Sequence, residues 1–217
     1  MMLNKYTIFA TIFFLLFNGC GKKSTKKESK ETAIPNFKLE NASYNLDSFN
    51  SQLHWVGKEI STKTHTGSLT IKNGKINIDA DGLINGMAEI DMTSINVTDL
   101  KDNAKSYLEG HLRSPDFFHV ELYPTAFITF KSENNNIINN TINLSGQLTI
   151  KDISHPIHFA AVIISTEPIL KAKANLSFDR TKYNIRFRSG KFFENLGDQL
   201  ILDQIDVDVV LVTKQSF

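Results

Sequence analysis

Apolar and polar residues alternate along most of the chain from Leu46 onward. In the segment 141–150, TINLSGQLTI, every even position is apolar or glycine and every odd position is polar. Because successive side chains of a strand point to opposite faces, this alternation predicts a strand with one buried face and one solvent-exposed face. The pattern recurs in further segments, at 52–60, 67–78, 87–95, 156–164, 169–178 and 203–213. The chain is therefore predicted to be mainly β.

Two Asn-Gly pairs, at 73–74 and 85–86, lie among the apolar residues of the first half of the chain. This dipeptide is favoured in two-residue hairpin turns because both positions tolerate positive φ, so we predict a turn at each pair. The segment 79–82, DADG, resembles part of a calcium-binding loop, but Ile90 stands where that loop requires glutamate. It is therefore predicted to be a plain turn.

One helix is predicted between the two groups of strands. Thr98 is a suitable N-cap, Asp99 and Asp102 would lie in the first turn, and Pro115 would end the helix. Four apolar residues recur at helical spacing on one face: Leu100, Ala104, Leu108 and Leu112. The predicted order is about four strands, a helix, and four or more strands, which favours a closed or nearly closed antiparallel barrel, or a sandwich.

Several of the predicted inward residues are small, namely Gly146, Ala161, Ala172 and Ala174. A barrel of about eight strands is either filled by its own side chains or holds one small ligand. Small inward residues leave volume, and they favour a hollow barrel. The alternative is a filled barrel in which the helix or a long loop occupies the space.

The first 19 residues have the features of an export signal, with Lys5 followed by about a dozen mostly apolar residues at 6–17. The end of this stretch, Gly19-Cys20, resembles a bacterial lipoprotein signal, which implies cleavage before Cys20 and acylation of this only cysteine. The chain would then be anchored to a membrane of the cell envelope, on the periplasmic or cell-surface side. The alternative is an ordinary secretory signal with an incidental cysteine.

Residues 20–42 begin with a lysine-rich stretch, GKKSTKKESKE at 21–31, that contains no apolar residue. Such a composition is typical of a disordered, solvated segment, so we predict a tether over 20–42 and a barrel domain over 43–217.

The chain offers few groups with the arrangement of a catalytic or metal site. His155 and His158 would lie on opposite faces of one strand, and the other histidines have no metal-ligand spacing. The sequence contains no nucleophile elbow and no phosphate-binding loop. A formal net charge of +1 provides no basic field for nucleic acid. We therefore predict a protein that is not an enzyme and uses no metal or cofactor.

A basic cluster with aromatic neighbours stands near the end of the chain. It is predicted to be a solvated rim of the barrel, or a contact for an anionic headgroup, and consists of Lys182, Arg186, Arg188 and Lys191.

The segment 111–118, HLRSPDFF, followed by Tyr123-Pro124 and the aromatic strand 127–130, resembles a signature of the YceI family. Further matches follow the family's order, at 53–58 (LHWVGK), 65–67 (HTG), 71–74 (IKNG), 92–95 (MTSI) and 146–157 (GQLTIKDISHPI). The resemblance covers about 46–212. It departs from the family's pattern at Asp152, where the family usually has glycine, and at 186–190, RFRSG.

The resemblance implies an exported, all-β protein with one helix, folded as an eight-stranded antiparallel lipocalin-like barrel. It also implies a long apolar pocket for a polyisoprenoid or other long-chain lipid, and it is compatible with a homodimer. The expected pocket lining is Trp55, Phe117, Phe118, Phe127, Phe130 and Phe159. The expected polar mouth is His65, His111, Arg113 and Arg188.

The adjacent rings of Phe117 and Phe118 raise a particular question, because neighbours on a strand point to opposite faces. One ring would pack the helix onto the barrel while the other lines the pocket, or both would lie in a plain core.

Two rival functions remain at this point. One is a structural or interaction protein of the cell envelope with a filled barrel. The other is an enzyme acting on a lipid or quinone, which would need an acid–base pair at the pocket mouth, such as His65 with Glu109 or Asp116.

Overall fold

The computed structural model describes residues 37–61 and 63–214. The predicted export signal, Cys20 and the tether up to residue 36 lie outside the described residues. Residues 37–42, which were also predicted as tether, are described and run directly into the first strand.

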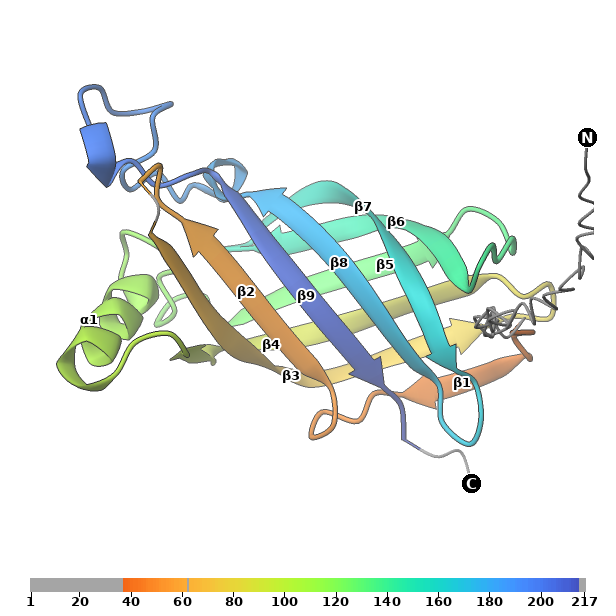
Figure 1. Cartoon of the computed structure of the whole chain (residues 1–217). Helices are drawn as coiled ribbons and strands as arrows, with labels where there is room; N and C mark the ends of the chain where they lie inside the picture. The colour runs from red at the N-terminus through yellow and green to blue at the C-terminus, as the bar shows by residue number, and fades with distance from the viewer. Residues whose placement is uncertain (1–36, 62, 215–217) are drawn as a thin grey trace, which may run out of the picture. The chain divides into compact units, whose positions relative to one another are not determined.

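The described residues form one antiparallel sheet that closes on itself, together with one α-helix (Figure 1). The elements in chain order are β1 (Ala42–Asn45), β2 (Gln52–Lys58), β3 (Thr64–Ile78), β4 (Ile84–Val97), α1 (Asp102–Arg113), β5 (Thr125–Ser132), β6 (Thr141–Ile150), β7 (Ile153–Ser165), β8 (Lys171–Asp179), η1 (Arg180–Tyr183), η2 (Gly197–Gln199) and β9 (Gln204–Val212).

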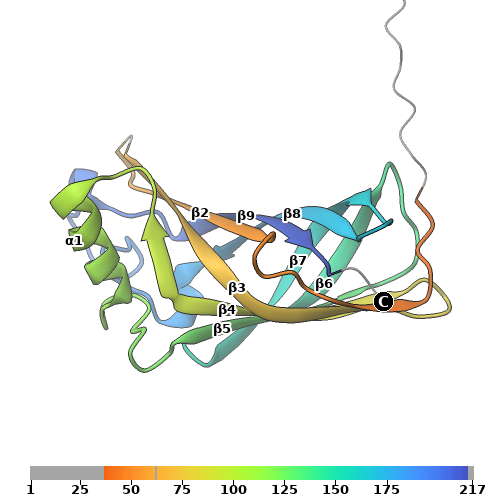
Figure 2. The same cartoon turned by 90° about the horizontal axis from the view of Figure 1, so that it is seen from below.

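Strands β2 to β9 pair in the order β3-β2-β9-β8-β7-β6-β5-β4, and the pairing of β3 with β4 closes the ring. The prediction of an eight-stranded antiparallel barrel with one helix is confirmed. The short strand β1 pairs with the C-terminal half of β3, while β2 pairs with the N-terminal half of β3. Helix α1 and the β8–β9 connection lie at one end of the barrel, and β1 lies at the other (Figures 1 and 2).

Burial follows the predicted alternation. In β6, Ile142, Leu144 and Leu148 are buried, whereas Asn143 and Gln147 are exposed. Closing the sheet gives each of the strands β2 to β9 a partner on both sides, although β7 pairs with β8 only over residues 160–165.

The turns predicted at the two Asn-Gly pairs are wrong. Gly74 lies inside β3, and Gly86 lies inside β4. The chain instead turns at 79–82, the segment that was predicted to be a turn: the N–H of Asp79 donates to the carbonyl of Leu83 at 3.0 Å, and Gly82 has a φ of +77°. Each misread glycine faces a bulky neighbour, since an added Cβ would lie 2.5 Å from Leu46 Cδ1 at Gly74 and 2.5 Å from Phe130 Cζ at Gly86.

Thr98 is not the N-cap of the helix, which begins at Asp102 after Lys101 without a side-chain cap. The backbone N–H of Thr98 donates to the carbonyl of Thr66, and the Asp99 carboxylate accepts from the N–H of Thr66, both at 2.9 Å. These bonds extend the contact of β4 with β3 and delay the helix. It ends at Arg113, just before Pro115, as predicted.

Candidate ligand-binding cavity

The barrel encloses a cavity of about 540 Å³, within the usual size range of small-molecule sites. Each of the strands β2 to β9 contributes apolar side chains to its wall. Helix α1 adds the apolar face that was predicted from its spacing, with Ala104, Leu108 and Leu112. An apolar cavity offers water few hydrogen-bond partners, so the space suits an apolar ligand.

Three of the four predicted small inward residues line the cavity, and the fourth does not. Ala161, Ala172 and Ala174 line it. Gly146 does not, because an added Cβ there would lie 1.8 Å from the backbone oxygen of Thr129 on β5. This glycine permits a close approach of two strands and does not provide volume.

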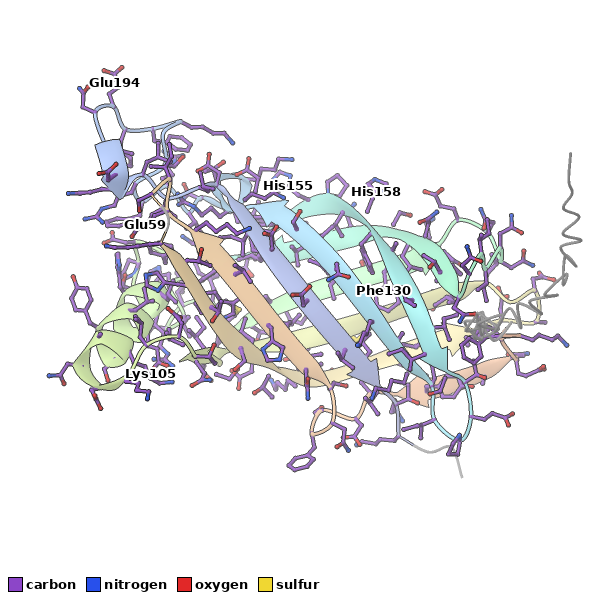
Figure 3. The ribbon with its side chains drawn as sticks, in the orientation of Figure 1. Glu59, Lys105, Phe130, His155, His158 and Glu194 are labelled. Atoms are coloured by element: carbon purple, nitrogen blue, oxygen red, sulfur yellow. The ribbon has the colours of Figure 1, made fainter. Side chains whose placement is uncertain are left out.

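Two of the predicted lining aromatics lie across glycines of neighbouring strands. Trp55 on β2 stands opposite Gly67 on β3, where an added Cβ would lie 2.2 Å from the indole. Phe130 on β5 stands opposite Gly86 on β4, and its ring meets that of Phe159 edge-on at 6.1 Å between centroids. Figure 3 labels Phe130 among the barrel strands. Trp55, Phe130 and Phe159 all line the cavity.

Both rings of the Phe117–Phe118 pair line the cavity. The two residues do not lie on a strand but in a turn after α1, where the N–H groups of Phe117 and Phe118 donate to the carbonyls of Ser114 and Leu112 at 3.1 Å. In a turn, neighbouring side chains need not point to opposite faces, and the two ring centroids lie 6.4 Å apart. Phe117 is buried, and Phe118 is partly buried.

Phe127 and Arg113 are not among the residues that line the cavity, which corrects the predicted lining and mouth. Phe127 is an odd number of residues from Phe130 on β5, so its ring lies on the outer face and is 39% exposed. The Arg113 guanidinium turns back to donate to the carbonyl of Ile95 at the end of β4.

Polar lining residues gather at the α1 end of the barrel, with Lys173 on β8 as the exception. They are Lys58, Glu59, His65, Tyr107, His111, Arg180 and Arg188. Lys58 and Tyr107 are exposed, so we identify this end as the mouth. Figure 3 places Glu59 at this end, with Lys105 of α1.

His65 at the mouth is held by a carboxylate, but not by the one that the enzyme hypothesis required. Its Nδ1 lies 2.8 Å from Asp99 Oδ2. Of the two predicted partners, Glu109 accepts from the N–H of Val97 at 2.8 Å, and Asp116 lies 3.8 Å from Nε2 of His111. Burial alone would raise the pKa of Asp99, but hydrogen bonds from the N–H of Thr66 and from His65 outweigh it and lower the pKa. Asp99 thus stays a carboxylate.

His111 belongs to a cluster of rings beneath the mouth. Its ring meets Phe117 at 5.0 Å and Phe187 at 4.5 Å, both edge-on, and Phe117 lies 5.6 Å from Phe187. Arg188 stacks its guanidinium over Phe187 at 5.1 Å, with a left-handed backbone at φ 49°. The cluster joins α1 to the β8–β9 connection and forms an apolar wall below the polar rim.

Arg180 is the one charged cavity-lining side chain that is fully buried within the described ranges 37–61 and 63–214, at 1% exposure. Its guanidinium donates to the carbonyls of Ile185 and Ile201 at 3.0 Å and of Leu202 at 3.2 Å, and it lies 3.4 Å from Asp203. These bonds join the beginning of the β8–β9 connection to its end. Burial also raises the pKa of the neighbouring Tyr183 to about 12, which keeps its phenol neutral.

Several lining residues at the two ends were not predicted from the sequence, among them Leu39, Tyr107 and Phe187. A signal for Leu39 was present, because apolar and charged residues alternate in FKLE at 37–40. Phe187 lies within the predicted basic rim, where its charged neighbours obscured its inward position.

Between residues 37 and 214, position 62 aside, no group of three or more His, Cys, Asp or Glu side chains could hold a metal ion. No helix in this part of the chain is long and apolar enough to cross a bilayer.

The fold and the site together define a class of protein, namely a closed antiparallel barrel around one apolar cavity with a polar mouth under a helix. Residues 44–213 match the family model described as the YceI-like domain. The chain belongs to this family, which confirms the resemblance that the sequence motifs indicated. None of the curated proteins matches the chain.

Solved structures share the fold at low sequence identity. BcnA of Burkholderia cenocepacia is 19% identical, with 78% of this chain and 99% of that chain covered and a TM-score of 0.60. A polyisoprenoid binding domain from Saccharophagus degradans, implicated in plant cell wall breakdown, is 17% identical, with 82% and 100% covered and a TM-score of 0.57. The Campylobacter jejuni YCEI protein is 17% identical, with 95% and 100% covered and a TM-score of 0.50.

Proposed function

We propose that the protein binds a long-chain isoprenoid or another long-chain lipid in its barrel cavity and acts as a carrier or sequestering protein. The apolar cavity of about 540 Å³ is the observation that carries this proposal. Burial of each methylene group contributes about 0.8 kcal/mol, so a chain of several methylenes would bind without charged contacts. The Saccharophagus degradans structure of similar fold is a polyisoprenoid binding domain, which agrees with this proposal.

The mouth does not contain the pair that the enzyme hypothesis named. His65 is paired with Asp99, whereas Glu109 accepts from the N–H of Val97 and Asp116 lies 3.8 Å from His111. The wall of the cavity is mainly apolar, which favours a binding role. A filled barrel, the basis of the interaction-protein hypothesis, is difficult to reconcile with the cavity volume.

We further propose that acylated Cys20 anchors the protein to a membrane of the cell envelope, on the periplasmic or cell-surface side. A lipid ligand and a membrane would then be its partners, and nucleic acid would not. Labelling cells with a radioactive fatty acid tests the anchor: we expect label on the protein and none on a Cys20→Ser variant.

Mass spectrometry of the full-length protein, under native and then denaturing conditions, tests ligand binding. Covalent acyl groups remain in the denatured mass, whereas a cavity ligand is lost and can be identified by organic extraction. We expect an apolar adduct at one per barrel in the native spectrum only. A native mass equal to the denatured mass, with no uptake of added polyprenyl or fatty-acyl lipids, would contradict the proposal.

Strand β5 offers a matched pair of variants for the same measurement. Phe130→Asp places a charge inside the cavity and should abolish the adduct, because an unpaired charge cannot be buried beside an apolar chain. Phe127→Asp places the same charge on the outer face and should retain the adduct. A folded Phe130→Asp protein that still binds lipid would show that the ligand lies elsewhere.

A further inference from the structure

The end of the barrel opposite the mouth is lined almost entirely by the sheet itself. Its wall is formed by Ile76, Ile84, Ile142 and Ile163 of the sheet and by Leu170, which directly precedes β8. One further lining residue, Leu39, comes from outside the sheet, in the segment that precedes β1. Figure 2 shows this orange-red segment crossing the end of the barrel away from α1.

Residues 37–40 place one side toward the barrel and the other toward solvent. Phe37 and Leu39 pack against the hydrophobic core. Lys38 and Glu40 between them are 86% and 69% exposed, and their charged groups lie 3.5 Å apart. The segment is therefore extended and amphipathic, with its apolar side over the end of the cavity.

This segment is held in place by β1. Ala42 pairs with Ile78, and Tyr44 pairs with Ile76, which fixes β1 to the end of β3 at the rim of the barrel. Residues 37–41, which directly precede β1, are thereby held at this opening. The match to the family model covers residues 44–213, so residues 37–43 precede the matched range. Residues 37–42 were predicted to be the last part of the tether.

We propose that Leu39, supported by Phe37, forms the floor of the cavity and binds the terminal end of the lipid chain. The mouth at α1 would then contact the headgroup, and the distance from mouth to floor would set the longest chain that fits. Residues that precede β1 would thus determine the ligand length that this protein selects. This inference rests on the proposed function.

A series of straight-chain alcohols of increasing length tests the floor in the full-length protein. Trp55 is the only tryptophan of the chain and lines the cavity, so its fluorescence reports binding. Affinity should rise about fourfold with each added methylene until the chain reaches the floor, and should then stop rising. Leu39→Ala deepens the cavity and should move this break to longer alcohols. Leu39→Phe makes it shallower and should move the break to shorter ones.

The paired exchange Lys38→Ala with Glu40→Ala is the matched control, because both side chains face solvent, and it should leave the break in place. Thermal unfolding of each variant verifies the fold, and shifts in opposite directions by Leu39→Ala and Leu39→Phe cannot arise from unfolding. Binding with the same break in all variants would overturn the floor but leave the proposed function intact. If the wild-type protein binds no alcohol of any length, the proposed function fails, and the floor fails with it.

Discussion

Several glycines in this barrel are required because nearby atoms leave no room for a Cβ, and not because the backbone has a positive φ. Gly67 and Gly86 lie beneath Trp55 and Phe130, two of the aromatic residues that line the cavity. Glycine within a strand often marks such a close approach. Asn-Gly inside a strand is indistinguishable in sequence from Asn-Gly in a turn, which explains why two turns were predicted where strands continue.

Replacing Gly146 or Gly110 by alanine should change the free energy of unfolding in opposite directions. Gly146→Ala should lower the free energy of unfolding by about 2 kcal/mol or more, because its Cβ would meet the backbone of Thr129 and Phe130 and the strands cannot separate freely. Gly110→Ala, within α1 and with nothing inside 4 Å, should raise it by about 1 kcal/mol through helix propensity. Urea unfolding measures both. A neutral Gly146→Ala variant would contradict the close approach of β5 and β6.

Arg180 provides a second residue-scale test. Arg180→Ala leaves the carbonyls of Ile185, Ile201 and Leu202 without a donor and Asp203 without its buried partner. We expect a loss of about 3–5 kcal/mol in the free energy of unfolding. Arg180→Lys should recover only part of the lost free energy. The single ammonium group of lysine cannot reach all three carbonyls to which the separate nitrogens of the guanidinium donate. Full recovery with lysine would show that charge alone matters there.

At the scale of elements, one side of helix α1 carries charged residues that bond to the backbone of β4, and its other side lines the cavity. Lys105, Glu109 and Arg113 follow each other at intervals of four residues, and all three bond the end of β4. Lys105 Nζ donates to the carbonyl of Val97, and Glu109 accepts from its N–H. Arg113 therefore positions the helix and does not line the cavity.

The pH dependence of Glu109 tests this fastening. The hydrogen bond from the Val97 N–H lowers the pKa of Glu109 below its usual value, and the hydrogen bond and positive charge of Lys105 lower it further. A carboxylate with a lowered pKa stabilises the folded state above its unfolded pKa of about 4.3, and this stabilisation is lost as the pH falls through the folded pKa.

We therefore expect wild type to be more stable than Glu109→Gln at neutral pH, and the difference to shrink on acidification below about pH 4.3. Urea unfolding over a pH series measures it. Glu121→Gln is a suitable control, since Glu121 is exposed and lies outside the helix. A difference that grows on acidification would contradict the role of Glu109 as a charged anchor.

The elements differ in how far the sequence could predict them. Alternation identified the second-half strands and their inward faces because each has one wet and one dry side, as in β6. The start of α1 was missed because Thr98 and Asp99 bond to Thr66, more than thirty positions earlier in the chain. Likewise, the turn that carries Phe117 and Phe118 is set by bonds back to the helix end, which sequence spacing does not reveal.

At the scale of the whole molecule, the central uncertainty in the sequence was whether the barrel is hollow. Inward aliphatic side chains predict a core equally well whether they meet or leave a gap, because the gap depends on barrel diameter. Ala161, Ala172 and Ala174 resolve this in favour of volume, because they line the cavity on two adjoining strands. The mouth could be predicted in part: His65, His111 and Arg188 line it, whereas Arg113 does not.

Two neighbouring alanines on β7 allow the hollow interior itself to be tested. Ala161 points into the cavity and is 7% exposed, whereas Ala160 is exposed on the outer face. Ala161→Trp should place an indole in the empty space, keep the barrel folded with an unchanged or raised melting temperature, and abolish the lipid adduct in native mass spectra. Ala160→Trp should retain both the fold and the adduct. If the interior were already filled, Ala161→Trp would instead overpack it and lower the free energy of unfolding by about 1–3 kcal/mol, so the melting temperature distinguishes a hollow barrel from a filled one even without knowledge of the ligand.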